Sequence, residues 1–493
     1  MKEVIKIGLG CILLLTVWAC NVKAKDKNTG AKVSKSESNR PNIIYILADD
    51  LGYGDIGVYG QQKFKTPNID KLAKDGMLFT QHYSGSTVCA PSRSTLMTGM
   101  HTGHTVVRGN KEIRPEGQYP IPDSTHTIAE ALKAKGYATG IFGKWGLGYP
   151  GSEGDPMNQG FDTFFGYNCQ RLGHNYYPRH LWSNADSLPI KENQGQQKGV
   201  YAPELIHQKT LQFIDDHKNT PFFLYVATII PHAELAAPEY LMQKHRGKYP
   251  PEIAFEGYDK GPEYRQGPYE SQKEPNAAFA AMMDLLDQQV GEIVQKLEDL
   301  GLTENTLLVF TSDNGPHQEG GANPEYFNSN ANLKGYKRDL YEGGIRVPMI
   351  AKWPGTIRPG STTDHISAFW DVFPTVVELA GGQPSEGLDG ISILPTLMGN
   401  SGEQEKHDYL YWEFHEKGGR QAIRKGKWKA VKYNVFNGDS ELELYDLSED
   451  IQEEENVAEL HPDIVAEMEQ IMQDARTPSS VFKFSQKTYL NSK

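Results

Sequence analysis

The chain has 493 residues, of which 38% are hydrophobic and 10% aromatic, and its formal net charge at pH 7 is −13. This length exceeds what one ordinary hydrophobic core supports, so a large domain and a smaller one are expected. The negative charge argues against a nucleic-acid-binding protein, which normally presents a basic face, and it requires any anion pocket to be locally basic.

Residues 1–20 have the pattern of a secretory signal peptide. Two lysines lie at the start of an apolar stretch, residues 7–19, that is too short to span a bilayer. The residues around Cys20 resemble a bacterial lipoprotein cleavage site. We therefore expect a periplasmic protein or an outer-membrane lipoprotein of a bacterium, with membrane attachment through a lipidated Cys20. Residues 21–40, rich in Lys, Ser and Asn, are expected to form a flexible tether.

Four apolar runs predict buried strands, and each run ends in polar residues. Residues 42–48 precede Asp49 and Asp50, residues 137–142 precede Lys144, residues 222–230 precede His232, and residues 306–311 precede Asp313 and Asn314. Between these strands lie segments with helical periodicity, namely residues 69–77, 127–135 and 275–300. In the second of them, Thr127 and Glu130 predict a capping box.

Strands that alternate with helices predict an α/β fold, a large and mainly parallel sheet flanked by helices on both faces. Such sheets gather their active sites at the carboxyl ends of strands, where the polar residues lie here. Short runs at residues 409–414, 420–424, 428–433 and 441–445 predict a small antiparallel sheet, followed by a helix at 462–472. We expect a catalytic domain at 41–400 and a C-terminal antiparallel-sheet subdomain at 401–493.

The segment from Cys89 to Gly99 reads CAPSRSTLMTG. If Pro91 opens a helix, Cys89 lies at its amino end and Arg93 lies about one turn further along the same face. An isolated cysteine in such a place is more often an inert buried thiol than a reactive one.

This segment resembles the signature of the type I sulfatases, arylsulfatase-like members of the alkaline phosphatase superfamily. In that family the cysteine of C-x-P-S-R is oxidised after translation to formylglycine. The resemblance implies that one hydroxyl of the aldehyde hydrate attacks the sulfur of a sulfate ester, and that loss of the other hydroxyl's proton then expels sulfate. It also implies a partner, either a formylglycine-generating enzyme or an anaerobic sulfatase-maturating enzyme, that modifies Cys89.

The two acidic pairs Asp49-Asp50 and Asp313-Asn314 offer oxygen ligands only, which suit a hard cation such as calcium or magnesium. Taken singly, each pair reads as an ordinary turn. The resemblance implies that both pairs, together with the modified Cys89, bind one calcium ion per chain. A zinc-dependent phosphatase of the same superfamily would need several histidine ligands and a Ser or Thr nucleophile instead.

Lys144 lies in GKWGLG, which resembles the GKWHLG segment of the family, in which the lysine bridges sulfate and nucleophile. The family's histidine is Gly146 here, so the residue that takes the proton from the hydrate is open. His317, four residues beyond Asp313, is the first candidate because Asp313 anchors its loop at the metal, and His174 is the second. Either histidine is equally compatible with a sugar contact or with an ordinary loop position.

His232, in PHAEL, matches the family's histidine near the leaving oxygen, although a histidine after a strand is often only bonded to backbone. Lys337 matches the lysine that precedes a YEGG-type sequence, and Lys334 is the alternative if the loop has another register. The resemblance thus implies that Arg93, Lys144, Lys337 and the cation neutralise a sulfate that gains charge during cleavage.

The expected function is hydrolysis of sulfate monoesters on a sulfated carbohydrate, such as a glycosaminoglycan or galactan fragment. Two aromatic and polar clusters are candidates to stack on sugar rings, with packing in the core as the alternative for each member. The first contains His174, Asn175, Tyr176, Tyr177, His180 and Trp182, and the second Tyr411, Trp412, His415 and Arg420. The competing functions are a phosphoester or phosphonate ester hydrolase of the same fold and, because of Gly146, a glycan-binding pseudoenzyme.

Overall fold

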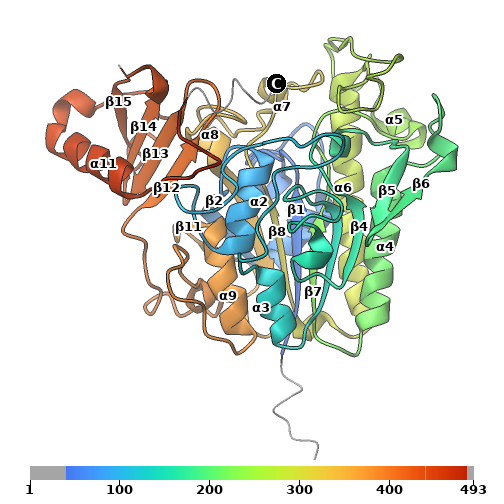
Figure 1. Cartoon of the computed structure of the whole chain (residues 1–493), viewed down its shortest axis with the longest axis horizontal. Helices are drawn as coiled ribbons and strands as arrows, with labels where there is room; N and C mark the ends of the chain where they lie inside the picture. Colours follow the sequence, from blue (N-terminus) through green and yellow to red (C-terminus); the bar gives the residue numbers. More distant parts are fainter. Residues whose placement is uncertain (1–39, 439, 486–493) are drawn as a thin grey trace, which may run out of the picture. The chain divides into compact units, whose positions relative to one another are not determined.

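The computed structural model describes residues 40–438 and 440–485 (Figure 1). The predicted signal peptide, the lipidated Cys20 and nearly all of the tether fall in residues 1–39 and lie outside the described residues. Within the described part of the chain, no helix combines the length and the apolar character needed to cross a membrane.

A large mixed sheet organises residues 42–368. Its strands run in the order β10-β2-β9-β8-β1-β7-β3-β4-β5-β6, and β11 pairs with β2. The strands are β1 (Asn42–Ala48), β2 (Met77–Tyr83), β3 (Ala138–Lys144), β4 (Thr163–Tyr167), β5 (His180–Ser183), β6 (Asp186–Pro189), β7 (Phe222–Ala227), β8 (Thr306–Ser312), β9 (Arg346–Lys352), β10 (Ser361–Thr363) and β11 (Ser367–Ala368). The central strands β8, β1, β7 and β3 are mutually parallel, with Tyr45 of β1 opposite Val309 and Tyr225.

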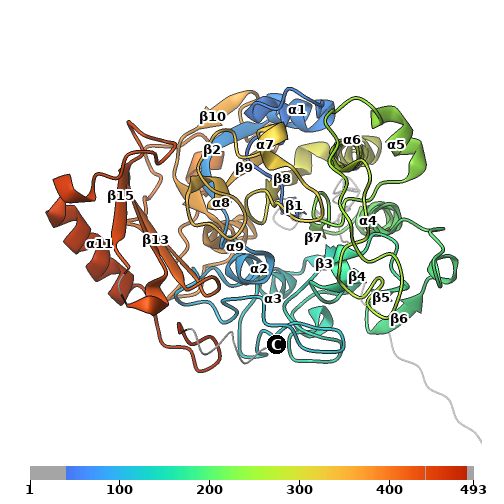
Figure 2. The same ribbon diagram turned by 90° about the horizontal axis from the view of Figure 1, so that it is seen from above.

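Helices cover both faces of this sheet (Figure 2). The α-helices of this region are α1 (Pro67–Lys74), α2 (Cys89–Thr98), α3 (Ile128–Ala134), α4 (Ala202–His217), α5 (Glu239–His245), α6 (Pro275–Asp299), α7 (Pro324–Phe327), α8 (Glu342–Ile345), α9 (Val372–Leu379) and α10 (Leu394–Leu397). Alternation along β1 explains the two layers: Ile44 and Ile46 pack in one core with α1, α4 and α6, whereas Ile43 and Leu47 pack in the other with α2, α3 and α9.

The C-terminal region forms a second, four-stranded antiparallel sheet in the order β12-β13-β14-β15. Its elements are β12 (Leu410–Phe414), β13 (Arg420–Lys425), β14 (Trp428–Tyr433), β15 (Leu442–Asp446) and the helix α11 (Pro462–Asp474). The predicted α/β fold with a small antiparallel sheet and one helix is therefore confirmed. The domain boundary at residue 400 stays a prediction.

Three local expectations differ from the structure. The helix of the CAPSRSTLMTG segment begins at Cys89 rather than at Pro91, because the extended backbone ends at Val88. The helix expected at 69–77 ends at Lys74, and Met77 already belongs to β2. Strand β7 ends at Ala227, so the last residues of the run at 222–230 are irregular and carry the chain towards His232.

A buried ionic cluster joins the two sheets through Glu342, the first residue of α8. Lys429 of β14 lies 2.9 Å from its carboxylate, Arg346 lies 3.3 Å away, and Tyr83 of β2 donates a hydrogen bond at 2.7 Å. Burial acts to raise the pKa of Glu342, but Lys429 and the neighbouring arginines outweigh it and lower the pKa. Since an unpaired buried charge is costly, each partner in this cluster requires the others.

We predict that Glu342→Gln lowers the free energy of unfolding by about 3–5 kcal/mol, because Lys429 loses the closer of its two buried counter-charges and keeps only Glu453 at 3.5 Å. The exposed pair of Lys425 and Glu467 provides the control, and Glu467→Gln is expected to cost less than about 1 kcal/mol. Urea unfolding measures both changes. Because the pKa of Glu342 is lowered, its contribution is present above the unfolded-state pKa of about 4.3 and is lost as the pH falls below it. Equal urea midpoints for the two variants would contradict this assignment.

Candidate active site

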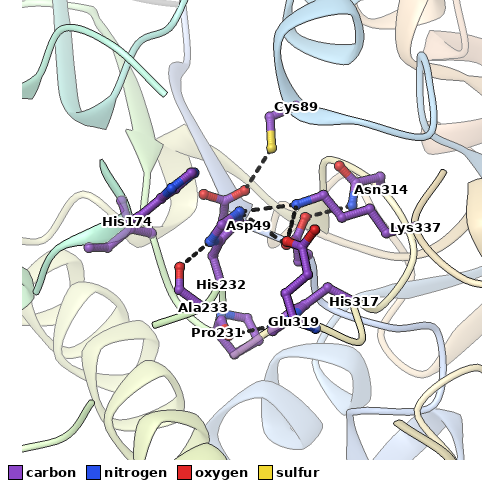
Figure 3. Close-up of polar contacts among 12 residues, drawn as sticks. Asp49, Cys89, His174, Pro231, His232, Ala233, Asn314, His317, Glu319 and Lys337 are labelled. Carbon is purple, nitrogen blue, oxygen red and sulfur yellow. Dashed lines mark hydrogen bonds and ion pairs between the residues drawn. The ribbon is translucent and has the colours of Figure 1, made fainter. Parts of the chain in front are cut away.

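The polar residues predicted at strand ends converge on one buried cluster (Figure 3). Asp49 and Asp50 directly follow β1, Lys144 is the last residue of β3, and Asp313 directly follows β8. Parallel strands deliver these side chains to the same edge of the sheet, as expected for an α/β fold. The start of α2 brings Cys89 to this edge from the helical layer.

Cys89 is buried at the first position of α2. Its Sγ lies 3.3 Å from Oδ1 of Asp49 and 3.4 Å from Nζ of Lys144. Burial, followed by the charge of Asp49, raises the pKa of the thiol well above its usual value. The unmodified side chain is therefore a neutral thiol and a poor nucleophile. Its position at the amino end of a helix, which usually lowers the pKa of a thiol, does not offset the burial.

Four oxygen-bearing side chains meet beneath Cys89. Oδ1 of Asp313 accepts a hydrogen bond from the backbone N–H of Asp50 at 3.1 Å, and the Asn314 amide donates to Oδ1 of Asp50 at 2.7 Å. Asp50 adopts a left-handed backbone with φ of 63°, which turns the chain sharply at the end of β1. All four residues, including Asp49, are fully buried.

Two observations support a hard divalent cation at this cluster. Oδ1 of Asn314 is buried without a hydrogen-bond partner. One carboxylate oxygen of Asp49 and one of Asp50 lie within 4.8 Å of each other, and also of the Cys89 sulfur and a ring nitrogen of His232. Burial and the neighbouring Asp49 also raise the pKa of Asp313. A bound cation would relieve this repulsion between carboxylates, and carbonyl and carboxylate oxygens are the ligands that calcium prefers.

Three cationic side chains surround the carboxylates. Arg93 binds Oδ2 of Asp313 through Nη2 at 2.9 Å, Lys337 Nζ lies 2.7 Å from Oδ2 of Asp50, and Lys144 forms an ion pair with Asp49. Burial acts to raise the pKa of Asp49, but Lys144 and Arg93 together hold it at about 2. The acidic molecule thus contains the locally basic pocket that the charge argument requires.

His232 lies between Lys337 and the acidic cluster. Its Nε2 is 3.0 Å from Nζ of Lys337 and 3.3 Å from Oδ2 of Asp50, and its Nδ1 contacts the carbonyl of Ala233. Burial, then the charges of Lys337 and Lys144, lower the pKa of His232 well below its usual value. The ring is neutral in this arrangement, with Nδ1 carrying the proton and Nε2 accepting from Lys337.

His174 and His317 flank His232 on its two sides. His174 stacks on His232 with ring centroids 4.6 Å apart, and its Nδ1 lies 3.1 Å from the carbonyl of Gly267. His317 has both ring nitrogens engaged, Nδ1 by the N–H of Glu319 and Nε2 by the carbonyl of Pro231. It lies against Asp50 and Glu319 rather than against Cys89. The cavity that contains Cys89 is lined by His174 and not by His317, so the structure reverses the expected order of the two candidates.

Lys337, and not the alternative Lys334, reaches the cluster. Nζ of Lys334 bonds instead to the Tyr445 hydroxyl at 3.1 Å and to the carbonyl of Glu453 at 3.0 Å, in the C-terminal region. Lys337, rather than Lys334, is therefore the lysine that corresponds to the one before the YEGG-type sequence.

A cavity of about 180 Å³ opens onto Cys89. Its lining is Cys89, Asn110, Glu112, Gln118, Gln170, Arg171, His174, His232, Tyr269, Glu319, Lys337 and Arg338. Sequence reasoning missed eight of these residues. Arg338 directly follows the predicted Lys337, and the other seven lie in segments that carry no motif. A larger cavity, of about 420 Å³, contains none of the predicted site residues. The smaller cavity is therefore the candidate active site.

The two predicted aromatic clusters are mostly core. Tyr176 and Tyr177 pack against Tyr201, and Tyr411 and Trp412 are fully buried residues of β12 in the small sheet. The remaining ring residues of the first cluster, His180 and Trp182, bond to Glu116. Only His174 of the ten candidates lines the cavity beside Cys89.

The chain matches models of known protein families along most of its length. The sulfatase model matches residues 41–382, and a second model, described as N-sulphoglucosamine sulphohydrolase, C-terminal, matches residues 335–478. The N-acetylgalactosamine-6-sulfatase of Rattus norvegicus is 33% identical over 386 residues, which cover 73% of this chain and 66% of that enzyme. The chain thus spans just under two thirds of the rat enzyme's length.

This chain covers a bacterial relative and a solved structure more completely. The N-acetylgalactosamine-6-O-sulfatase of Bacteroides thetaiotaomicron is 29% identical, with 94% of this chain and 97% of that protein covered. The crystal structure of Ps i-CgsB in complex with k-i-k-neocarrahexaose superposes with a TM-score of 0.75 at 28% identity, over 92% of this chain and 96% of that one. With the sulfatase model matched over more than half of its residues, this chain belongs to the sulfatase family of sulfuric ester hydrolases.

Proposed function

We propose that this protein hydrolyses sulfate monoesters of carbohydrates through a formylglycine made from Cys89. The observation that carries the proposal is the position of Cys89 at the start of α2, with its sulfur 3.3 Å from Asp49 and 3.4 Å from Lys144. A side chain placed there lies between a set of acidic metal ligands and a set of cations. Such an arrangement suits a nucleophile that must meet an anionic ester.

Modification supplies the reactivity that the neutral thiol lacks. We propose that a formylglycine-generating or an anaerobic sulfatase-maturating enzyme oxidises Cys89 before the chain is fully folded, because the mature thiol is only 3% exposed. As the hydrated aldehyde, formylglycine supplies two hydroxyl groups. One is the nucleophile, and loss of the proton of the other can later release the sulfate. The raised pKa of Cys89 supports this proposal, since an unmodified thiol there would stay protonated.

Asp49, Asp50, Asp313 and Asn314 are the residues that would hold one calcium ion. When bound, the ion supplies Lewis acidity that polarises sulfate oxygens. Arg93, Lys144 and Lys337 bind and orient the anionic group, and they stabilise it most when charge builds up on its leaving oxygen. His232 and Lys337, 3.0 Å apart, form the pair that faces the leaving oxygen and shares a proton there.

The proposed substrate is a sulfated sugar. The relatives named above include two N-acetylgalactosamine 6-sulfatases and a protein solved with k-i-k-neocarrahexaose. The cavity beside Cys89 supports a polar ligand, because Glu112, Arg171 and Glu319 line it with charged groups that hydroxyls can bond to. We also propose that the enzyme is exported by a bacterium and held at a membrane by a lipid on Cys20.

The experiment that tests this function is a screen of defined sulfated mono- and disaccharides against the enzyme co-produced with a sulfatase-maturating enzyme. Release of inorganic sulfate from at least one sugar is expected. Matched aryl sulfate and aryl phosphate esters are measured in parallel. A higher kcat/KM for the phosphate would reassign the site to phosphoester hydrolysis, and tight sugar binding without release of sulfate would identify a pseudoenzyme.

We predict that Cys89→Ala lowers kcat by a factor on the order of 10⁴ or more, because the variant has no group to carry the nucleophile. Its melting temperature is expected to stay within a few degrees of wild type. Cys169→Ala, which removes the other described cysteine, provides the control and retains activity. Initial rates on an aryl sulfate give the comparison, and substantial turnover by Cys89→Ala would refute the nucleophile.

We predict that Asp313→Asn raises the calcium dissociation constant at least about tenfold, or about 1.4 kcal/mol, because it removes one ligand charge without changing the side-chain shape. Calorimetric titration of chelator-treated enzyme with calcium chloride measures the constant. Asp287→Asn removes a buried carboxylate that caps α1 away from the cluster, and it should bind calcium like wild type. Equal constants for all three proteins would place the metal elsewhere.

A further inference from the structure

Gln170 is a buried residue whose side-chain amide is left without a partner. It follows β4 in the loop that leads to His174, and only 5% of the residue is exposed. Its backbone N–H donates to Oε1 of Gln118 at 3.2 Å. Neither Nε2 nor Oε1 of Gln170 has a hydrogen-bond partner within the described residues, although the side chain lines the cavity beside Cys89.

Gly146 shows where this amide lies. A Cβ built on Gly146 would come within 1.7 Å of Nε2 of Gln170, so the amide fills the space that a side chain at position 146 would take. Gly146 follows two residues after Lys144, whose Nζ lies 3.4 Å from the Cys89 sulfur. The Gly146 backbone is fixed by its N–H bond to the carbonyl of Asn168 at 3.0 Å. The Gln170 amide therefore occupies the space beside position 146, where the sulfatase family has a histidine side chain.

A buried primary amide with no partner is unfavourable, because it has lost its bonds to water and has gained none in exchange. It carries two donor hydrogens and two acceptor lone pairs. Native structures keep few such groups, and a ligand that binds beside them removes the penalty. Lys337 and Arg338 line this cavity, and Lys144 lies beside Cys89. The two lining carboxylates are already paired, Glu319 with Lys337 and Arg338 and Glu112 with Arg171, so the cations favour an anionic ligand.

On the basis of the proposed function, we propose that Gln170 is a substrate-contacting residue, and that its Nε2 donates a hydrogen bond to an oxygen of the sulfate group held next to position 89. The amide binds and orients this group. It does not remove a proton, since a carboxamide is too weak a base to accept one at neutral pH. Gln170 thus contacts the sulfate from the space beside position 146, but it does not act as a base.

The test compares Gln170→Ala with Gln404→Ala. Gln404 is also buried, but its amide is fully paired, with bonds to the carbonyls of Ser392 and Glu405 and from Thr396. Matured proteins are assayed with 4-nitrophenyl sulfate, titrated with inorganic sulfate, and melted. We expect Gln170→Ala to weaken sulfate binding and kcat/KM by roughly 10- to 100-fold and to leave the melting temperature unchanged or higher. Gln404→Ala should lower the melting temperature and keep wild-type kinetics.

The outcomes separate this inference from the proposed function. An inactive wild-type enzyme would count against the proposed function itself. An active wild type with equal sulfate affinity and kcat/KM in Gln170→Ala would overturn the inference. A fall in melting temperature as large as that of Gln404→Ala would also overturn it, because it would give Gln170 a structural role.

Gly146→Ala provides an independent arm. The added Cβ displaces the Gln170 amide, so kcat/KM should fall roughly tenfold in the wild-type background and by less than twofold in the Gln170→Ala background. The Gly146→Ala substitution also strains the backbone, because residue 146 has a φ of 84°. This strain lowers the melting temperature equally in both backgrounds. Equal losses of kcat/KM in the two backgrounds would contradict the contact between position 146 and Gln170.

Discussion

A balance of buried charges at the ends of the parallel strands β1, β3 and β8 is the constraint on which the rest of this structure depends. Three carboxylates and three cations meet there with almost no access to water: Asp49, Asp50, Asp313, Arg93, Lys144 and Lys337. Neither set could be buried without the other. A divalent ion added to this balanced set leaves the site positive, which is the condition for holding a sulfate ester in a protein of net charge −13. Under the proposed function, the position of Cys89 beside both sets makes this balance part of the reaction site.

Much of this arrangement was predictable because its signals are local. After Asn42, residues 43–48 are continuously apolar, as expected for a strand buried on both faces, and β1 spans Asn42–Ala48. The Thr127 and Glu130 capping box forms as expected at the start of α3. Order along the chain then suffices to bring Asp49, Lys144 and Asp313 together, since parallel strands place their carboxyl ends on one edge.

The rest depends on loops, whose paths follow from tertiary packing. His317 follows Asp313 closely in sequence, but its loop turns the ring towards Glu319 and Pro231 rather than towards Cys89. The aromatic residues near His174 give the composition of a sugar platform, yet Tyr176 and Tyr177 are needed to fill the core beside α4. Gln170 carries no motif at all. Only the space above Gly146 identifies it, and that space is a property of two loops that are distant in sequence.

The most direct test of the account is the chemical identity of residue 89 in the natively matured, active enzyme. Peptide mass spectrometry is applied to the tryptic fragment that contains this position, on the same preparation whose release of sulfate has been measured. The account predicts that the side chain has lost its sulfur and carries an aldehyde that reacts with a hydrazide probe. An intact thiol at residue 89 in fully active enzyme would contradict it.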